Sequence, residues 1–593
     1  MNLTRTAALL ASLVLASCAQ PPQVSDAVTK PAPETAAKPP LPKVVTRKPE
    51  PREPPLPAVE LSESLLFKIT LAEIAAQRGQ PHVAVPAFLE VARETRDPRI
   101  ARRATEIAWN ARFLPAALEA ATLWLQADPE STRARQTVIS LLVNQSRLDD
   151  AQPHLEKWLS GDPENVGQNF LQLYSLLSGH QDKAAIQRLI ARLVSFHPQV
   201  PEASLALAQA AWNADDVATA LKSSREALRL RPGWELAALF QAQALQRDSV
   251  DEAAAFLGDF VKTHPGARDA RLNYARLLVR AQRYPEARKQ FEILLGEAPN
   301  NAEIAMAVAT LSMQAKDYAA ADTQLRRALE IGAKDPDMVR MYLGQVNEEL
   351  KRDSEALKWY SSITHGAQFI PAQARYAGVL ARQGRLQDAR KHLHGVNPGD
   401  VRQRMQLTLA EAGLLRESGA YQEAFDFLGE ALARSPDSPD LLYDHAMAAE
   451  KVNRLDVLET NLRRLIALQP DHAHAHNALG YTLADRNQRL PEARTLIETA
   501  HRLAPNDPYI LDSLGWVLYR LGENEAALGH LRRAYEMRPD GEIAAHLGEV
   551  LWILGRRDEA QKIWTDALRV QPKNEALQGT IKRFAPVVLQ STQ

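Results

Sequence analysis

The segment Leu511–Pro539, LDSLGWVLYRLGENEAALGHLRRAYEMRP, decides the fold because it contains two short amphipathic helices joined by a turn. Apolar residues share one face of each expected helix, at Leu511, Leu514 and Leu518 and then at Ala527, Leu531 and Ala534. Gly522 and Asn524 loosen the turn, and Pro539 ends the second helix. The small residues Gly515 and Ala527 allow the two helices to approach closely. Neither helix can bury its apolar face alone, so the segment predicts a helical hairpin that stacks on similar neighbours.

The same hairpin recurs along almost the whole chain. Alanines follow one another at steps of 33 to 35 residues, with Leu458 taking the small-residue position once: Ala84, Ala117, Ala151, Ala185, Ala220, Ala253, Ala287, Ala321, Ala356, Ala389, Ala424, Ala493, Ala527 and Ala560. Prolines keep the same step: Pro98, Pro129, Pro163, Pro198, Pro232, Pro265, Pro299, Pro436, Pro470, Pro505, Pro539 and Pro572. A period near 34 residues indicates a solenoid of helical hairpins, which works by displaying surface.

The repeated unit resembles the tetratricopeptide repeat (TPR), with the pattern W-x2-L-G-x2-Y, A-x3-F-x2-A and P. Its clearest copies carry Leu511, Leu514, Gly515, Leu518, Ala527, Leu531, Ala534 and Pro539; Ala544, Leu547, Gly548, Leu551, Ala560, Trp564, Ala567 and Pro572; His476, Leu479, Gly480, Leu483, Ala493, Ile497, Ala500 and Pro505; and Tyr274, Ala275, Leu278, Ala287, Phe291 and Pro299. Leu343, Gly344, Ala356 and Tyr360 mark a looser copy. The resemblance implies an all-α, right-handed superhelix of about fifteen units. The more degenerate units are expected over 61–335 and the more regular ones over 336–580, before a tail at 581–593.

The N-terminal residues indicate an export signal. A basic residue, an apolar core and small residues precede Cys18, the single cysteine of the chain, and residues 1–17 read as a cleaved signal peptide. The sequence Leu15-Ala16-Ser17-Cys18 resembles the bacterial lipobox, which implies cleavage before Cys18 and lipidation of its thiol. Ala19 in place of Asp then implies the periplasmic face of the outer membrane. The alternative is an ordinary signal peptide followed by an incidental cysteine.

A proline-rich segment separates Cys18 from the first repeat. Residues 18–60 contain many prolines and few large apolar residues, so they cannot build a core and are expected to be a disordered tether. The tether would let the solenoid reach partners beneath the membrane. Equally, it can be a generic linker without a binding role.

Composition and motifs argue against catalysis and nucleic-acid binding. The 71 basic residues balance 72 acidic ones, so no excess of positive charge favours nucleic acid. No HExxH, Walker A or GxSxG motif is present, and we expect no enzyme activity, cofactor or metal. His472 and His476 could share a helix face, but they lie where a first helix begins. Capping and solvation of that helix start is the simpler interpretation.

Two groups of side chains are candidates for binding proteins, because the TPR pattern directs certain positions of the first helix into the groove. In the C-terminal units these are His474, Asn477, Tyr481, Tyr509, Asp512, Trp516, Tyr519, Arg520 and Trp552, with Glu542 and Glu549 at equivalent positions. A second, basic strip suited to an acidic partner comprises Arg99, Arg102, Trp109, Asn110, Arg133 and Asn144. The alternative for each aromatic residue is packing between units.

The lipobox, tether and repeats together resemble Gram-negative outer-membrane TPR lipoproteins, in particular the LbcA-type adaptors of periplasmic carboxyl-terminal processing proteases. That resemblance implies protein partners, namely a periplasmic PDZ-containing serine protease and the cell-wall (peptidoglycan) hydrolases presented to it for degradation. Membrane contact would occur only through Cys18. A scaffold for exopolysaccharide secretion or envelope assembly is the alternative, and a hydrolase or transferase with an unrecognised site is the third possibility.

Overall fold

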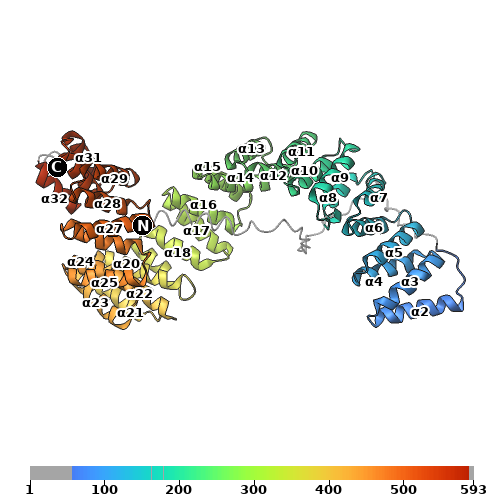
Figure 1. The fold of residues 1–593 in the computed structure, drawn as a ribbon, viewed down its shortest axis with the longest axis horizontal. Helices are drawn as coiled ribbons and strands as arrows, with labels where there is room; N and C mark the ends of the chain where they lie inside the picture. Colours follow the sequence, from blue (N-terminus) through green and yellow to red (C-terminus); the bar gives the residue numbers. More distant parts are fainter. Residues whose placement is uncertain (1–55, 162, 178, 587–593) are drawn as a thin grey trace, which may run out of the picture. The chain divides into compact units, whose positions relative to one another are not determined.

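A computed structural model describes residues 56–161, 163–177 and 179–586 of the chain (Figure 1). The expected signal peptide, Cys18 and the tether up to residue 55 therefore lie outside the described residues, as do the last seven residues of the expected tail. The chain forms two compact units, one ending at Ala333 and the other beginning at Lys334.

Every regular element of the described residues is an α-helix, which confirms the all-α prediction. The first unit holds α2(Glu63–Gln77), α3(Pro81–Thr95), α4(Pro98–Asn110), α5(Leu114–Ala127), α6(Thr132–Asn144), α7(Leu148–Ser160), α8(Val166–Leu177), α9(Lys183–Ser195), α10(Pro201–Asn213), α11(Val217–Leu230), α12(Glu235–Gln246), α13(Val250–Thr263), α14(Arg268–Arg280), α15(Tyr284–Glu297), α16(Ala302–Gln314) and α17(Tyr318–Ile331). The second unit holds α18(Pro336–Glu349), α19(Asp353–Ser361), α20(Phe369–Arg382), α21(Leu386–Gly395), α22(Val401–Glu417), α23(Tyr421–Arg434), α24(Pro439–Lys451), α25(Leu455–Leu468), α26(Ala473–Asp485), α27(Leu490–Leu503), α28(Pro508–Arg520), α29(Asn524–Met537), α30(Gly541–Ile553), α31(Arg557–Val570) and α32(Glu575–Phe584).

The helices pair as hairpins, each made of an even-numbered A helix and the odd-numbered B helix that follows it. The pairing runs from α2 and α3 to α30 and α31, except that α8 and α9 both pack on α10 rather than closely on one another, and α32 packs on the last hairpin. The described residues thus contain the helical-hairpin solenoid that the 34-residue period predicts. Successive hairpins bury apolar clusters that span several repeats, from Ala72 to Ala210 in the first unit and from Leu442 to Ala585 in the second, since a single hairpin cannot cover its own apolar face.

The alanine series marks a fixed position of the B helices. Ala527 is the fourth residue of α29 and is fully buried, and the same holds for Ala84 in α3 and Ala287 in α15. Leu458 occupies that position in α25, in agreement with the sequence-based prediction. A small residue is favoured there because the B helix approaches its A helix most closely at its first turn.

One member of the series, Ala185, was wrongly assigned. It is the third residue of α9 and is only partly buried, whereas the fourth residue, Ile186, is 5 % exposed and faces the core. The reason is local: Asp182 accepts a hydrogen bond from the Ala185 amide and thereby fixes the start of α9 at Lys183. Ala185 follows Ala151 at the interval of the repeat, but it lies one residue before the buried position of α9.

The glycine of the Leu-Gly pair has a packing role at each regular hairpin. A Cβ atom added to Gly515 would lie 2.5 Å from Leu531 Cγ and 3.0 Å from the carbonyl oxygen of Ala527. This confirms that small residues at 515 and 527 permit the close approach of α28 and α29. The turn between these helices needs glycine for another reason, because Gly522 has φ of +89°.

Ion pairs join consecutive B helices along the chain. Arg288 reaches Asp317 at 2.8 Å, and Arg494 reaches Glu523 at 2.9 Å, each about one repeat further on. Glu459 is bound by two arginines. Arg489 and Arg463 donate hydrogen bonds to its carboxylate at distances of 2.6 and 2.8 Å, respectively. The Arg489 hydrogen bonds, followed by those of Arg463, lower the pKa of Glu459 to about 2. The outer carboxylates are thus matched by cations.

We expect Glu459→Gln to lower the free energy of unfolding at neutral pH by about 1 to 2 kcal/mol, after allowance for solvent screening. Because the folded pKa is depressed, Glu459 stabilises the fold above the unfolded value of about 4.3. That contribution is lost as pH falls toward about 2. Denaturant titrations of both proteins between pH 7 and pH 2 should therefore converge at the acidic end. Glu430, 75 % exposed and 3.9 Å from Arg434, is the matched control, and Glu430→Gln should leave the curve unchanged.

Candidate functional site

The strongest candidate surface is formed by the A helices of the last hairpins. Asp512 in α28 and His546 in α30 lie one repeat apart, and His546 Nδ1 is 3.0 Å from both carboxylate oxygens of Asp512. Both side chains are more than nine-tenths buried. Burial by itself lowers the pKa of His546, but the adjacent Asp512 carboxylate outweighs it and leaves that pKa raised. The pair therefore favours an imidazolium bound to a carboxylate.

Aromatic rings surround this pair. Trp516 stacks on His546 with ring centroids 4.1 Å apart and an interplanar angle of 22°. Tyr519 lies 5.2 Å from the Trp516 ring, and the Arg520 guanidinium lies 5.7 Å from the same ring. Tyr481, two hairpins earlier than His546, is 6.0 Å from the imidazole. Side chains from α26, α28 and α30 therefore meet in one cluster.

Two hydrogen bonds tie the tyrosines of this cluster to later A helices. Tyr481 donates its hydroxyl to Glu542 at 3.0 Å, and Tyr519 donates to Glu549 at 3.1 Å. Glu549, 5 % exposed, also accepts from Arg583 in α32 at 2.6 Å. Burial, then the Glu549 charge, raises the pKa of Tyr519 to about 12, and burial with Glu542 raises the pKa of Tyr481 as well. Both phenols remain donors at physiological pH.

The structure brings together five of the predicted C-terminal residues: Tyr481, Asp512, Trp516, Tyr519 and Arg520. Asp512 and Trp516 are buried within the cluster. Tyr481, Tyr519 and Arg520 are more exposed and provide most of the surface of the cluster. His546 and Arg583 were not among the residues predicted from the sequence. A signal was present, because each lies 34 residues after the acid that it binds, Asp512 and Glu549.

The remaining predicted C-terminal residues lie apart from this cluster. The Trp552 ring is 5.8 Å from the buried ring of Trp564, which is packing within a hairpin, and the Arg557 guanidinium lies 5.3 Å from the centre of the Trp552 ring. Tyr509 is 43 % exposed and stacks beneath Arg538. His474 is exposed and Asn477 is half-buried. Packing, the alternative interpretation for aromatic residues, thus describes Trp552.

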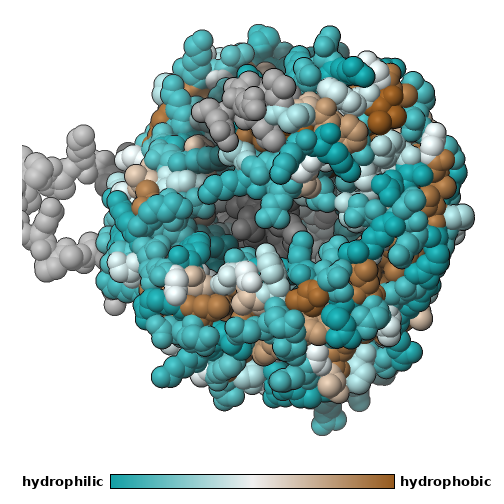
Figure 2. All heavy atoms as spheres, turned by 90° about the vertical axis from the view of Figure 1, so that its left-hand side faces the viewer, coloured by the Kyte–Doolittle hydropathy of each residue, from teal (hydrophilic) through white to brown (hydrophobic). Residues whose placement is uncertain are grey.

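A group of carboxylates lies on the earlier A helices α24 and α26, and one of them, Asp485, is near enough to act on Tyr481 and His546. Asp444 and Glu450 of α24 are half-buried, and neither they nor Asp485 of α26 forms an ion pair or side-chain hydrogen bond with the described residues. Burial raises the pKa of Asp444 and of Glu450, and the charge of Glu542 raises the latter further. Figure 2 shows that the face of this unit is hollowed at its centre and rimmed mainly by hydrophilic residues. These carboxylates of the A helices therefore differ from acids such as Glu459 and Glu523, which are bound by arginines.

We expect Glu450→Gln to raise the free energy of unfolding at neutral pH, by about 1 kcal/mol. Burial raises the pKa of Glu450. Its stabilising contribution is therefore complete below the unfolded pKa of about 4.3 and is lost as pH rises toward the folded value. The positive charges of Lys451 and Arg486 lower the pKa of Glu450, while the negative charges of Glu542 and Asp485 raise it. Thermal unfolding of both proteins at several pH values should show a gain for Glu450→Gln only on the neutral side, and a loss there would contradict this account.

The predicted basic strip lies on α4 and α6 of the first unit, but much of its charge is matched. Arg99 binds Asp97 at 2.7 Å and Arg102 binds Glu106 at 2.9 Å, while Arg133 lies 3.9 Å from the same Glu106. Asn110 and Asn144 are exposed, and Asn144 donates to the Ser140 carbonyl. The strip is therefore closer to neutral than its sequence suggests.

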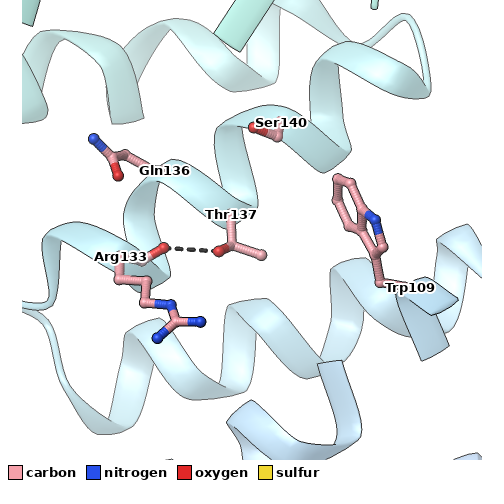
Figure 3. Close-up of a pocket in the computed structure, with 5 residues that line it drawn as sticks. All are labelled: Trp109, Arg133, Gln136, Thr137 and Ser140. Atoms are coloured by element: carbon pink, nitrogen blue, oxygen red, sulfur yellow. Dashed lines mark hydrogen bonds between the residues drawn. The ribbon is translucent and has the colours of Figure 1, made fainter. Parts of the chain in front are cut away.

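Within this strip, Trp109 and Arg133 line a shallow pocket of about 230 Å³. Figure 3 shows Trp109 and Arg133 on either side of Thr137, with Gln136 and Ser140 completing the wall. Trp109 is 39 % exposed, so an aromatic face and a cation are both open to a partner. This combination is frequent at protein-binding hot spots.

The histidines that could have held a metal have other roles. His472 caps α26 by accepting a hydrogen bond from the Ala475 amide at 3.1 Å, and His476 Nε2 lies 3.0 Å from the Pro470 carbonyl. In the part of the chain that the structure describes, no three His, Cys, Asp or Glu side chains are grouped as metal ligands. Likewise, no helix in the described ranges combines the length and hydropathy needed to cross a bilayer.

Comparisons with known proteins identify the repeat. A family model described as Tetratricopeptide repeat matches residues 244–311, and a second of the same description matches 306–369, 443–508 and 513–574. The chain is 33 % identical over 491 residues to the TPR repeat-containing protein PA4667 of Pseudomonas aeruginosa, which covers 82 % of each protein.

Similar solved structures include TTC0263, a thermophilic TPR protein of Thermus thermophilus, with 26 % identity, 31 % of this chain and 98 % of that chain covered, and a TM-score of 0.28. Another is the structure of Naa15/Naa10 bound to HypK-THB, with 13 % identity, 89 % and 93 % coverage, and a TM-score of 0.34. Together, the family models and the relative that matches four-fifths of the sequence show that this chain belongs to the tetratricopeptide-repeat proteins.

Proposed function

We propose that the chain is a protein-binding scaffold anchored at the periplasmic face of the outer membrane. Family membership supports a role in protein–protein interaction. The observation that carries the proposal is the cluster in which Tyr481 and Tyr519, hydrogen-bonded to polar partners, present surface beside the buried Trp516 on the A helices of the C-terminal unit. Rigid aromatic area beside fixed donors and acceptors suits the recognition of another protein. The lipobox-like sequence at Cys18 supports the anchor.

The specific role we propose is that of an adaptor for a carboxyl-terminal processing protease. The support is the resemblance of the lipobox, tether and repeats to the adaptor class of TPR lipoproteins. The scaffold would bind the protease at one set of repeats and a peptidoglycan hydrolase at another. Two proteins bound to one scaffold experience a mutual effective concentration in the millimolar range, which accelerates proteolysis without a catalytic group on the scaffold.

The test begins with the location of the chain and its partners. Cys18→Ser should move the protein from the outer-membrane fraction to the soluble periplasmic fraction. Residues 19–593 fixed on a resin should then capture a PDZ-containing serine protease and cell-wall hydrolases from periplasmic extract. In a purified mixture of these two, adding the scaffold should accelerate hydrolase degradation. Capture of polysaccharide-secretion components without any protease would overturn the adaptor role and favour the secretion scaffold.

A further inference from the structure

Several carboxylates of the C-terminal unit have no ion-pair partner among the described residues, although Arg416 acts on Asp444 and Lys451 and Arg486 act on Glu450 from a distance. We call Asp444, Glu450, Asp485 and Glu542 the acidic floor; they lie on α24, α26 and α30. None of the four forms an ion pair with the described residues, and only Glu542 accepts a side-chain hydrogen bond, from Tyr481. On the outer face, by contrast, Arg463 lies 2.5 Å from Glu492 and Arg494 lies 2.9 Å from Glu523.

Three members of the acidic floor, Glu450, Asp485 and Glu542, lie close enough to repel one another. Glu542 and Asp485 both raise the pKa of Glu450, and both also act on Tyr481. Residues 450 and 542 are therefore electrostatic neighbours although they belong to hairpins three repeats apart. Like charges that are unpaired and partly buried, as at Asp444 and Glu450, destabilise a fold. Stability alone does not explain this arrangement, whereas a cationic ligand would compensate for its cost.

His546 supplies an independent sign of a ligand on the same side. The residue is 6 % exposed, and its Nδ1 atom is held by Asp512. Its Nε2 atom has no hydrogen-bond partner among the described residues. The ring lies 6.0 Å from Tyr481, whose hydroxyl binds Glu542 on the same helix as His546, so His546 faces the acidic floor. An Nε2–H donor in this position suits a backbone carbonyl of an extended chain.

We propose that the concave side of the C-terminal unit binds an extended segment of a partner protein through the Lys or Arg side chains of that segment. The carboxylates of the acidic floor bind the cationic groups, and the face of Tyr481 adds a cation–π contact. His546 donates to the main chain of the segment. This inference rests on the proposed protein-binding function and names the chemistry of the partner.

The test uses the full chain without its signal peptide and three peptides of equal length. One carries four lysines separated by glycine and serine, the second carries acetyl-lysine at the same positions, and the third carries glutamate. Isothermal titration should detect binding of the lysine peptide alone, and that binding should weaken as salt rises. Equal binding of the acetyl-lysine peptide, or preference for the glutamate peptide, would overturn the proposal.

Variants locate the site. The triple variant Asp444→Asn, Glu450→Gln and Asp485→Asn should weaken lysine-peptide binding by on the order of 10- to 100-fold. Its melting temperature should stay constant or rise, because unpaired charges are removed; a loss of binding that accompanies unfolding would therefore be recognised. The matched control changes two exposed outer acids, Glu430→Gln with Glu536→Gln, and should bind normally. Unchanged binding by the triple variant would reject the acidic floor as the site.

A fourth peptide tests whether the occupant is the chain itself. Residues 38–52 carry five basic residues and one acidic residue, Glu50, among prolines. If this peptide bound more tightly than the designed lysine peptide, the partner assignment would be replaced by self-recognition. The capture experiment separates the two proposals: failure to capture any protein would reject the scaffold function. Normal capture by the triple variant would reject only the acidic floor.

Discussion

Replacement of Glu348 by alanine is expected to lower the free energy of unfolding of the C-terminal unit by about 2 to 4 kcal/mol. Glu348 is 8 % exposed and joins two hairpins. Arg375 donates to one carboxylate oxygen at 3.1 Å and Arg382 to the other at 2.5 Å, both from α20. The hydroxyl of buried Tyr360 donates to the same carboxylate. Alanine would leave all three donors without their acceptor.

The size of this effect follows from the burial of the donors as well as of Glu348. Burial, then the Glu348 charge, raises the pKa of Tyr360, so its hydroxyl stays protonated and needs an acceptor. Arg382 is 55 % exposed and can be hydrated again, which is why the expected loss stays below that of a fully buried ion pair. Glu348→Gln keeps the side-chain volume and one acceptor, and should lose about half as much.

Native-state hydrogen exchange of α18 to α20 in the full chain measures this prediction, because the repeats can open separately. Asp388→Ala is the control, since Asp388 is 55 % exposed and binds only Arg385, and it should change stability by less than about 0.5 kcal/mol. If Glu348→Ala changed the stability as little as Asp388→Ala, the hydrogen bonds around Glu348 would not stabilise the contact between the hairpins.

The hairpin solenoid could be predicted from the sequence because its determinants are local. The apolar spacing at Leu511, Leu514 and Leu518 sets one helix face, and the alanine at the fourth position of the following helix sets the pairing. Ala185 shows the limit of this reasoning. The period fits it, but the N-cap at Asp182 shifts the helix start and places Ile186 in the core. Capping decides register within a turn, and a repeat interval does not.

The candidate sites were harder to predict because they depend on contacts between repeats. Trp516 and Trp552 both lie on A helices, yet Trp516 stacks on His546 of the next hairpin and Trp552 on Trp564 of its own. Arg102 contributes less charge than its sequence suggests because Glu106 lies one turn later on the same helix. Burial and charge matching are properties of neighbours, and the period alone does not specify them.

The second large effect is expected at the contact of Gly548 with Trp564. A Cβ atom at residue 548 would lie 2.0 Å from Trp564 Nε1 and 2.3 Å from Cε2. Trp564 is fully buried and cannot move aside without disturbing α31. Gly548→Ala should therefore destabilise the last hairpin by about 2 to 3 kcal/mol, although alanine is the better helix former.

A double-mutant cycle distinguishes a clash with Trp564 from a general sensitivity of α30 to substitution. Trp564→Ala should cost about 3 to 5 kcal/mol by creating a cavity. Adding Gly548→Ala to that variant should cost nothing further, since the clash is gone, which gives a coupling energy of about 2 kcal/mol or more.

Gly529 is the matched control, because it is helical and exposed, with no atom within 4 Å of an added Cβ. Gly529→Ala should stabilise the chain by about 0.5 to 1 kcal/mol. Additive losses at residues 548 and 564, measured by hydrogen exchange of α30 and α31, would show that glycine is needed there for a reason other than the indole.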